Sequence, residues 1–228
     1  MPELYYYETL GSTLDATHDL ASKGAMAGTC VIADEQTAGR GRLGRRWTSR
    51  PGAGLWMTML DRPSSSAALD VLALRVGLYV AEALDGLAST QVQVKWPNDL
   101  QIHGRKLAGI LVETRWRGAS AEWVAIGLGL NIIDPGTSTS IGLGGAATRL
   151  DVLRLVVRAI RLAGAPRDYL SPGELSRFAA RDALHGKQIV EPAPGIADGV
   201  TAEGELRIRN GGDIVMVRSG SVSLARPD

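Results

Sequence analysis

Apolar and polar residues follow two periodicities along the chain, and together these predict a mixture of strands and helices. Short apolar or alternating runs predict β-strands over residues 4–9, 29–34, 55–60, 92–95, 107–112 and 123–133. Apolar residues at helical spacing and helix-start signals predict helices over residues 13–24, 69–84, 150–163 and 172–184. Because strands and helices do not alternate regularly, we expect an α+β fold with a mixed, hairpin-rich sheet rather than a doubly wound parallel sheet.

Turn and cap residues mark the boundaries of these elements. Ser12 to Asp15 has the form of a capping box, which would start the first helix. Gly104 stands between two strand-like runs and predicts a hairpin turn. Residues 135–147 are rich in Gly, Ser and Thr and predict a loop, and the serines 64–66 after Pro63 predict a break in the chain.

The last part of the chain differs from the rest. Residues 187–224 contain short alternating runs separated by turns such as 210–212, Asn-Gly-Gly. This pattern predicts a small all-β module, folded as a little barrel. We therefore expect two domains, a larger one at residues 1–184 and a small β domain at residues 185–228.

Composition narrows the class of protein. The 228 residues carry a net charge of +1 and are 45% hydrophobic, as expected of a globular chain with a sizeable core. A general nucleic-acid or membrane binder would usually carry a marked basic excess, so neither is expected. Cys30 has no partner for an intramolecular disulfide, the three histidines lie far apart, and the N-terminal residues lack a signal-peptide pattern. A cytoplasmic protein is expected.

The strongest chemical signal lies in residues 37–47, Thr-Ala-Gly-Arg-Gly-Arg-Leu-Gly-Arg-Arg-Trp, which we call the arginine loop. Glycine lets backbone approach a ligand closely, and arginine offers a planar fork of donors for phosphate or carboxylate. The stretch therefore predicts a loop that wraps an anion. A plain surface loop would not require so tight an alternation, and a nucleic-acid patch would require a wider basic field. Trp47 can stack on a base or fasten the loop to the core.

Residues 95–99, Lys-Trp-Pro-Asn-Asp, place a cation, an amide and a carboxylate around a proline turn at a strand end. Pro97 restricts Trp96 to an extended conformation and so fixes the direction of the residues that follow. Asn98 and Asp99 can present oxygens to a hydrated Mg²⁺ bound to phosphates, or they can satisfy the local backbone in an Asx turn.

Three further positions can take part in a site. Lys106 stands at the start of the strand over residues 107–112, where its ammonium can point into a pocket. Gly127 and Gly129 let a ligand lie flat on the next strand, or they mark a curved core strand, and Asn131 adds a polar group at its end. Ser12 and Thr13 bind a ligand at the helix N-terminus or only cap the helix.

In their order and spacing, these motifs resemble those of bacterial biotin–protein ligases. The matching blocks are residues 11–13, 36–47, 95–100, 105–113 and 126–132. The resemblance covers most of residues 5–133 and, more loosely, the C-terminal module. It implies a biotin/lipoate ligase-like catalytic domain with a mixed, largely antiparallel sheet and helices, followed by a small SH3-like β-barrel. The Ser-Thr motif begins almost at the N-terminus, so we expect a short form without the DNA-binding domain that many family members carry.

The resemblance implies that ATP activates biotin as biotinyl-5′-AMP with release of pyrophosphate. Biotin is then expected to pass to a lysine of a biotin carboxyl carrier protein domain of acetyl-CoA carboxylase or a related carboxylase. A carboxylate must approach an anionic α-phosphate, so Arg42 and Lys106 are expected to stabilise the transition state, with Mg²⁺ on the triphosphate. Asp99 is expected to take the proton of the incoming lysine or to orient it.

The resemblance also assigns residues to the two substrates. Biotin is expected to contact Ser12, Thr13, Gln36, Gly39, Arg40, Gly41, Lys106, Gly109, Gly127 and Gly129. ATP is expected to contact Arg40, Arg42, Trp47, Asn98, Lys106 and Asn131. No residue is assigned firmly as a metal ligand, because Mg²⁺ would arrive with ATP. Residues 39–47 are expected to be mobile in the free protein and ordered over ligand.

Two other functions stay open at this point. A lipoate–protein ligase would share the fold and the adenylation chemistry, although residues 95–99 and the adjoining block 105–109 favour biotin. A non-catalytic nucleic-acid module would use the arginine loop alone. Edge strands of the sheet are compatible with a homodimer, and no DNA or membrane partner is expected.

Overall fold

The computed structural model describes residues 1–63, 69–144, 147–164 and 168–225. Its larger sheet contains β1 (Leu4–Leu10), β2 (Cys30–Gln36), β3 (Gly54–Asp61), β4 (Gln93–Lys95), β5 (Asp99–Ile102), β6 (Arg105–Arg117) and β7 (Ser120–Asn131). The helices are α1 (Thr13–Ser22), α2 (Leu69–Leu84), α3 (Arg149–Ala163) and α4 (Pro172–Ala179), with a short 3-10 turn, η1 (Arg42–Gly44). A second sheet contains β8 (Gln188–Glu191), β9 (Gly195–Val200), β10 (Leu206–Asn210), β11 (Asp213–Val217) and β12 (Ser223–Leu224).

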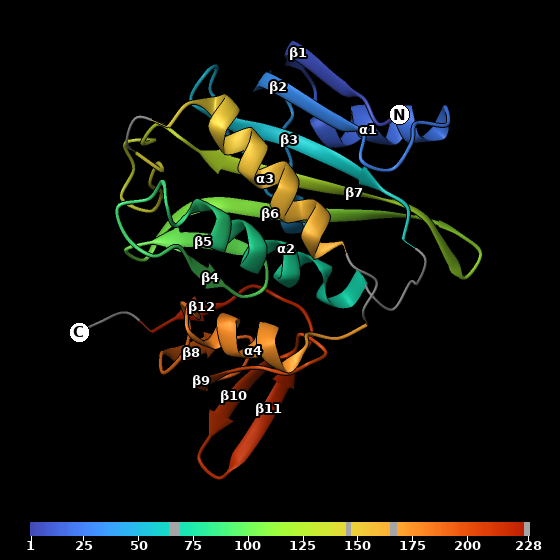
Figure 1. Ribbon diagram of the computed structural model, residues 1–228. Helices are drawn as coiled ribbons and strands as arrows, with labels where there is room; N and C mark the ends of the chain where they lie inside the picture. The colour runs from blue at the N-terminus through green and yellow to red at the C-terminus, as the bar shows by residue number, and fades with distance from the viewer. Residues whose placement is uncertain (64–68, 145–146, 165–167, 226–228) are drawn as a thin grey trace.

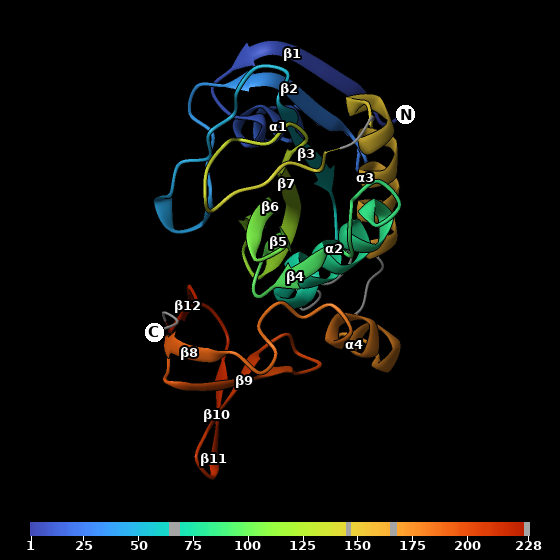
Figure 2. The ribbon, with the colours of Figure 1, turned by 90° about the vertical axis from the view of Figure 1, so that its left-hand side faces the viewer.

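The larger sheet has the strand order β1-β2-β3-β7-β6-β5-β4. Only the outermost pair, β1 with β2, is parallel among the described pairs of this sheet, because α1 forms the crossover between them. Helices α2 and α3 cover one face, while α1 and the arginine loop lie on the other (Figures 1 and 2). The predicted mixed, largely antiparallel α+β fold is confirmed.

The main core lies between the sheet and the two helices that cover it. Apolar residues of α2 and α3, such as Val76, Val80 and Val156, are completely buried there. They pack in one cluster with strand residues such as Ile110 and Ile126. Because β3, β6 and β7 lie in the middle of this sheet, their backbone positions are fixed by pairing on both sides.

The C-terminal module is an antiparallel sheet of order β11-β10-β9-β8-β12 below the larger sheet (Figure 1). This confirms the predicted small β module. Two buried contacts tie it and α4 to the rest of the chain. The indole N–H of Trp96 donates to the carbonyl of Gly204 at 2.9 Å, and Arg75 of α2 pairs with Glu174 of α4 at 2.9 Å.

Some local predictions were wrong, and each has a physical reason. Ser12 does cap α1 by accepting from the amide of Leu14, but the Asp15 carboxylate pairs with Arg40 instead of closing a capping box. The predicted fourth helix ends at Ala179, because the chain then runs beside β4, where Ala183 N–H donates to the carbonyl of Val94.

The remaining differences concern a short strand and positions outside the described residues. Residues 99–102 form β5, which was not predicted because its four residues directly follow the proline turn. The hairpin turn expected at Gly104 joins β5 to β6, as its positive φ of 73° allows. The predicted break at residues 64–66, and residues 145–146 of the predicted loop, lie outside the described residues. Along the described chain, no helix is both long enough and apolar enough to span a membrane.

Candidate active site

The floor of the site is the surface of β3, β6 and β7 around Gly109, Gly127 and Gly129, and we refer to it as the glycine floor. Gly109 of β6 lies directly beside Gly129 of β7, which is also paired with Trp56 of β3. The indole of Trp47 rests on these glycines. A Cβ on Gly129 would lie 2.4 Å from Cε2 of Trp47, so only glycine permits this approach. Close approach of the Trp47 ring is therefore the reason for glycine at this position, whereas the sequence predicted that a ligand would lie there or that the strand would be curved.

The hairpin of β5 and β6 supplies charged and amide groups at one end of the floor. Asp99 Oδ1 lies 2.7 Å from Nζ of Lys106. Asn98 Nδ2 donates to the carbonyl of Ile110 at 2.6 Å, and its Oδ1 accepts from Arg42 at 3.4 Å. The three residues predicted to be catalytic, Arg42, Asp99 and Lys106, thus meet at one place.

The opposite end of the floor is lined by buried polar groups from α1 and β2. Gln36 Oε1 accepts from the amide of Thr13 at 2.8 Å and from its hydroxyl at 3.1 Å. The Gln36 amide donates onward to Ser49 at 3.0 Å, and Thr58 donates to Thr13 at 2.8 Å. This network holds an amide and three hydroxyls in fixed orientation, which is what a polar head group requires.

The arginine loop covers the floor as a narrow hairpin. Trp47 N–H donates to the carbonyl of Gly39 at 2.9 Å, and Gly41 N–H donates to the carbonyl of Arg45 at 2.7 Å. At the tip, Leu43 has a left-handed φ of 56° and is 71% exposed. The tip therefore stands away from the core, and contacts of the loop's side chains hold it in place.

The C-terminal module reaches the loop from the other side. Arg42 donates to the carbonyl of Gly220 at 3.5 Å, and Arg45 donates to the hydroxyl of Ser221 at 3.1 Å. Gly220 and Ser221 precede β12, which lies on the same face of the larger sheet as the loop (Figure 2). The C-terminal module thus contributes part of the wall.

These elements enclose one cavity. Twelve of the predicted site residues line it: Thr13, Gln36, Arg40, Gly41, Arg42, Trp47, Asn98, Asp99, Lys106, Gly109, Gly127 and Gly129. The other three do not. Ser12 caps α1, Gly39 packs against the carbonyl of Trp47, and Asn131 lines an adjoining hollow with Lys106 and Trp47.

Sequence reasoning missed other lining residues. Lys95 and Trp96 lie in the quoted block 95–99, and Arg45 lies in the arginine loop, so the signal for them was present. Leu14 follows the Ser-Thr pair and packs near Gly127. Residues 220–222 also line the cavity, but nothing in their sequence marks them, because only the docking of the C-terminal module brings them there.

The charges around the cavity are unbalanced. Six cationic side chains line it: Arg40, Arg42, Arg45, Arg46, Lys95 and Lys106. Among the described lining residues, Asp99 is the single carboxylate. Burial lowers the pKa of the Lys95 ammonium, and neighbouring cations add to the effect. Burial, together with the nearby Arg45, also lowers the pKa of the Arg42 guanidinium. The excess of cations over the single described carboxylate of the lining favours an anionic ligand.

The residues present do not form a metal cage of their own. Described His, Cys, Asp and Glu residues form no group of three that could hold a metal ion. Asp99 is already paired with Lys106. Since Mg²⁺ retains waters and is commonly held by one or two carboxylates together with substrate phosphates, this donor set fits an ion brought by a polyphosphate.

The arrangement suits the binding of two ligand groups side by side. The described lining residues include no histidine or cysteine. They combine a flat glycine floor, a polar end around Thr13 and Gln36, and a cationic end around Lys106. Such a site can hold a flat apolar molecule with a polar head group at one end and bring its other end to a phosphate.

Comparison with known proteins agrees with this geometry. The family model described as "Biotin/lipoate A/B protein ligase family" matches residues 8–131. A bifunctional ligase/repressor BirA of Bacillus subtilis is 40% identical over 130 residues, which are 57% of this chain and 40% of that protein. The chain thus matches about two fifths of the length of that relative.

Two further relatives match nearly the whole chain. A biotin–(acetyl-CoA-carboxylase) ligase of Mycobacterium tuberculosis is 29% identical over 94% of this chain and 86% of its own. The solved structure of biotin protein ligase from Aquifex aeolicus in complex with biotin and ATP superposes with a TM-score of 0.81 at 26% identity, covering 100% of both chains. The fold described above is therefore shared from end to end with a solved ligase.

Proposed function

Because the chain belongs to the biotin/lipoate A/B protein ligase family, we propose that it activates biotin with ATP and transfers the biotinyl group to a carrier protein. The first step forms biotinyl-5′-AMP and releases pyrophosphate. The second forms an amide with a lysine of a biotin carboxyl carrier protein domain, of acetyl-CoA carboxylase or a related carboxylase, and releases AMP. One observation carries the proposal: cationic Lys106 and Arg42 meet at the end of a glycine floor built to hold a flat ligand.

The first step needs positive charge at the place where two anions meet. The biotin carboxylate must attack an α-phosphate that is itself negatively charged, and more charge gathers on the phosphate oxygens in the transition state. Arg42 and Lys106 would stabilise this charge, and Lys95 adds a third cation from the turn. Mg²⁺ carried by ATP would neutralise the remaining phosphates. Those phosphates would hold the ion, because the single carboxylate among the described lining residues, Asp99, is already paired with Lys106.

Biotin would lie along the glycine floor. We place its ureido ring at the polar end, near Thr13, Gln36 and the backbone of residues 39–41, where donors and acceptors are held in position. Trp47 covers Gly109 and Gly129, and Leu14 covers Gly127, so the apolar body and tail would pack against these two side chains within the cavity. Ser12 supports this end by capping α1.

The nucleotide would lie beside Trp47, Asn98 and Asn131. The indole Nε1 of Trp47 is buried and has no hydrogen-bond partner among the described residues, so a ligand acceptor would satisfy it. The Lys106 ammonium lies 5.1 Å from the centre of the Trp47 ring, which connects this side of the cavity to the reacting groups.

Asp99 has a second proposed role in the transfer step. An incoming lysine is an ammonium and must lose a proton before it attacks the acyl carbon. Asp99 is a carboxylate at the cationic end, held at 2.7 Å from Lys106, and would orient that amine or accept its proton. The products are then an amide on the carrier and free AMP.

The wider assignments follow from the same proposal. The larger domain at residues 1–184 would carry the chemistry, and residues 185–228 would help to close the site. The reaction would take place in the cytoplasm, where ATP and the carrier are made. Strand β1 ends the larger sheet on one side, whereas residues 181–183 pair with β4 on the other, so the homodimer would form along the β1 edge. A DNA partner is not part of the proposal.

The decisive experiment is pyrophosphate exchange into ATP, run with biotin and, in parallel, with lipoate and octanoate. We expect exchange with biotin alone, and an Lys106→Met variant that loses activity by about a hundredfold or more. Lys23→Met is the matched control, because Lys23 forms an exposed ion pair on α1 away from the cavity. Exchange with lipoate or octanoate in place of biotin would favour the lipoate ligase, and absence of exchange with a salt-dependent shift on DNA or RNA would favour the nucleic-acid module.

A further inference from the structure

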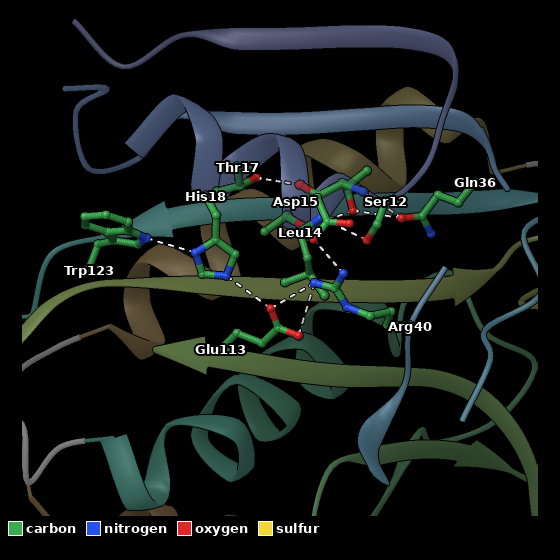
Figure 3. Close-up of polar contacts among 11 residues, drawn as sticks. Ser12, Leu14, Asp15, Thr17, His18, Gln36, Arg40, Glu113 and Trp123 are labelled. Atoms are coloured by element: carbon green, nitrogen blue, oxygen red, sulfur yellow. Dashed lines mark hydrogen bonds and ion pairs between the residues drawn. The ribbon is translucent and has the colours of Figure 1, made fainter. Parts of the chain in front are cut away.

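A chain of polar contacts lies behind the arginine loop, outside the cavity (Figure 3). Trp123 Nε1 of β7 donates to Nδ1 of His18 on α1 at 2.9 Å. The other ring nitrogen of His18 lies 3.1 Å from Oε2 of Glu113 on β6. Neither Trp123 nor His18 lines the cavity, so the proposed chemistry leaves both without a role.

The contact with Trp123 fixes the tautomer of His18. An indole N–H is a donor and never an acceptor, so Nδ1 of His18 must present its lone pair. The ring is then neutral, its proton sits on Nε2, and Nε2–H donates to Glu113. The Trp123 indole is 7% exposed, so water does not compete freely for this hydrogen bond. Two residues thus orient the Glu113 carboxylate.

Glu113 in turn binds the arginine loop. Its two carboxylate oxygens lie 3.0 and 3.3 Å from Nη2 of Arg40, and Asp15 lies 2.5 Å from Nη1 of the same guanidinium. The side chain of Asp15 is 60% exposed, whereas that of Glu113 is 31% exposed. The Asp15 contact is the shorter of the two, and the Glu113 contact is the less exposed to screening by water.

The guanidinium of Arg40 is therefore bound to α1 and β6. Burial opposes its charge, but the hydrogen bonds that the guanidinium donates to Asp15 and Glu113 prevail and raise the pKa of Arg40. Holding this side chain also holds the neighbouring backbone, in which Gly39 and Gly41 pair across the hairpin with Trp47 and Arg45. Arg42, two residues further on, reaches Asn98 from this backbone.

We propose that His18 and Trp123 are positioning residues, which set the closed position of the arginine loop through Glu113 and Arg40. Trp123 fixes the His18 tautomer, His18 orients Glu113, and Glu113 holds the loop against α1. The side chain of Arg40, which borders the cavity, then serves to hold the loop. The structural part of this inference concerns the ligand-free protein, and only its kinetic part rests on the proposed function.

Hydrogen exchange of residues 39–47 in the ligand-free protein tests the structural part. We expect exchange about tenfold faster in Glu113→Gln, about fivefold in His18→Leu and about threefold in Trp123→Phe, which keeps the ring and removes the donor. His18→Gln restores a side-chain N–H and should return exchange close to the parent rate. Trp116→Phe is the matched control, because Trp116 lies on β6 beyond Glu113 and is 50% exposed.

The kinetic readout separates positioning from a general loss of stability. In His18→Leu and Trp123→Phe we expect the KM for biotin to rise about fivefold with kcat nearly unchanged, and the His18→Gln variant to recover. Loop exchange equal to the parent in both variants would overturn the inference. So would acceleration that spreads equally over the strands of the larger sheet, since that would report only destabilisation. If the parent chain shows no biotin-dependent exchange of pyrophosphate, the proposed function fails, and the loop measurement still decides the positioning role.

Discussion

The glycine floor and the arginine loop face each other across the same cavity, yet they are held in opposite ways. Each floor strand is paired through its backbone on both sides, and Leu128 between the two β7 glycines is 2% exposed. The loop is tied to its neighbours by backbone at its start, where Thr37 and Ala38 donate to the carbonyls of Leu10 and Gly11, and from Gly39 to Trp47 the backbone bonds described above lie within the loop. Leu43 at its tip is 71% exposed. A surface made of paired strands has one conformation, whereas a cover held by charged side chains can open and close at modest cost.

This difference separates two tasks. The floor fixes where a ligand lies, because a displacement of its backbone would break a row of hydrogen bonds in the sheet. On the proposed function, the loop would determine how long a bound molecule stays. A mixed anhydride such as biotinyl-5′-AMP reacts with water, so a cover that opens only for the carrier would protect it. Substitutions in the two regions should accordingly change different quantities.

The largest effect is expected on the floor, from Gly129→Ala. The new Cβ would lie 2.4 Å from Cε2 and 2.6 Å from Nε1 of Trp47, so the indole must move away from the glycine floor. We expect kcat/KM for biotin-dependent pyrophosphate exchange to fall about a hundredfold, with little change in thermal midpoint because Trp47 belongs to the loop. Gly173→Ala is the matched control, since a Cβ there meets nothing within 4 Å. Similar activity in the two variants would mean that the close contact between Trp47 and Gly129 is not required for activity.

A smaller effect of a different kind is expected in the loop, from Arg42→Gly. This change removes the donor to Asn98 and Gly220 together with a cation at the proposed α-phosphate position. We expect the protein to release biotinyl-5′-AMP about thirtyfold faster. The measurement is the rate of release after rapid dilution of the loaded protein. Arg158→Ala on α3 is the control, because α3 covers the opposite face of the sheet (Figure 2). An unchanged rate of release would mean that the arginine loop does not retain the adenylate.

The smallest expected effect is on the pH dependence of folding stability. Cys30 of β2, in the same sheet as the glycine floor, reports it. Burial raises the pKa of the Cys30 thiol to about 11. Between about pH 9 and pH 11 the unfolded chain therefore binds fewer protons than the folded one, and stability falls as the pH rises. By pH 10 the expected loss relative to pH 8 is about 1 kcal/mol.

Urea unfolding of the parent and of Cys30→Ala at the two pH values isolates this contribution, because other titrating groups are common to both proteins. The same thiol should react slowly with thiol reagents in the folded protein, since it is 4% exposed and only opening of the sheet uncovers it. Thiol labelling as fast as exchange in residues 39–47 would mean that floor and loop open together, and the comparison above would then fail.

The floor was largely predictable from the sequence, and the closure of the site was not. Strands over residues 107–112 and 123–133, the glycines 127 and 129, and the turn at Gly104 are local patterns, so each could be identified from its own neighbourhood. The block 95–99 also predicted where cation, amide and carboxylate would meet.

Contacts made over long distances left no such pattern. Asp15 could be expected to close a capping box, because the competing Arg40 lies 25 residues away in sequence. Residues 220–222 reach the cavity only through the docking of the C-terminal module. His18 and Trp123 are 105 positions apart, and nothing around either residue predicts a hydrogen bond between them. Side-chain partners of this kind require the tertiary structure.

The hydrogen bond from Trp96 to Gly204 has a consequence for any attempt to separate the two parts of the chain. Trp96 is 1% exposed and stands inside the block that forms the cationic end of the cavity. Its acceptor belongs to the C-terminal module. A shortened protein ending at residue 184 would keep this indole but lose its acceptor, and an unsatisfied buried donor costs about 1–3 kcal/mol. The boundary predicted at residue 184 therefore separates two sheets. We expect the stability of the chain and the shape of the turn at residues 95–99 to depend on the residues on both sides of it.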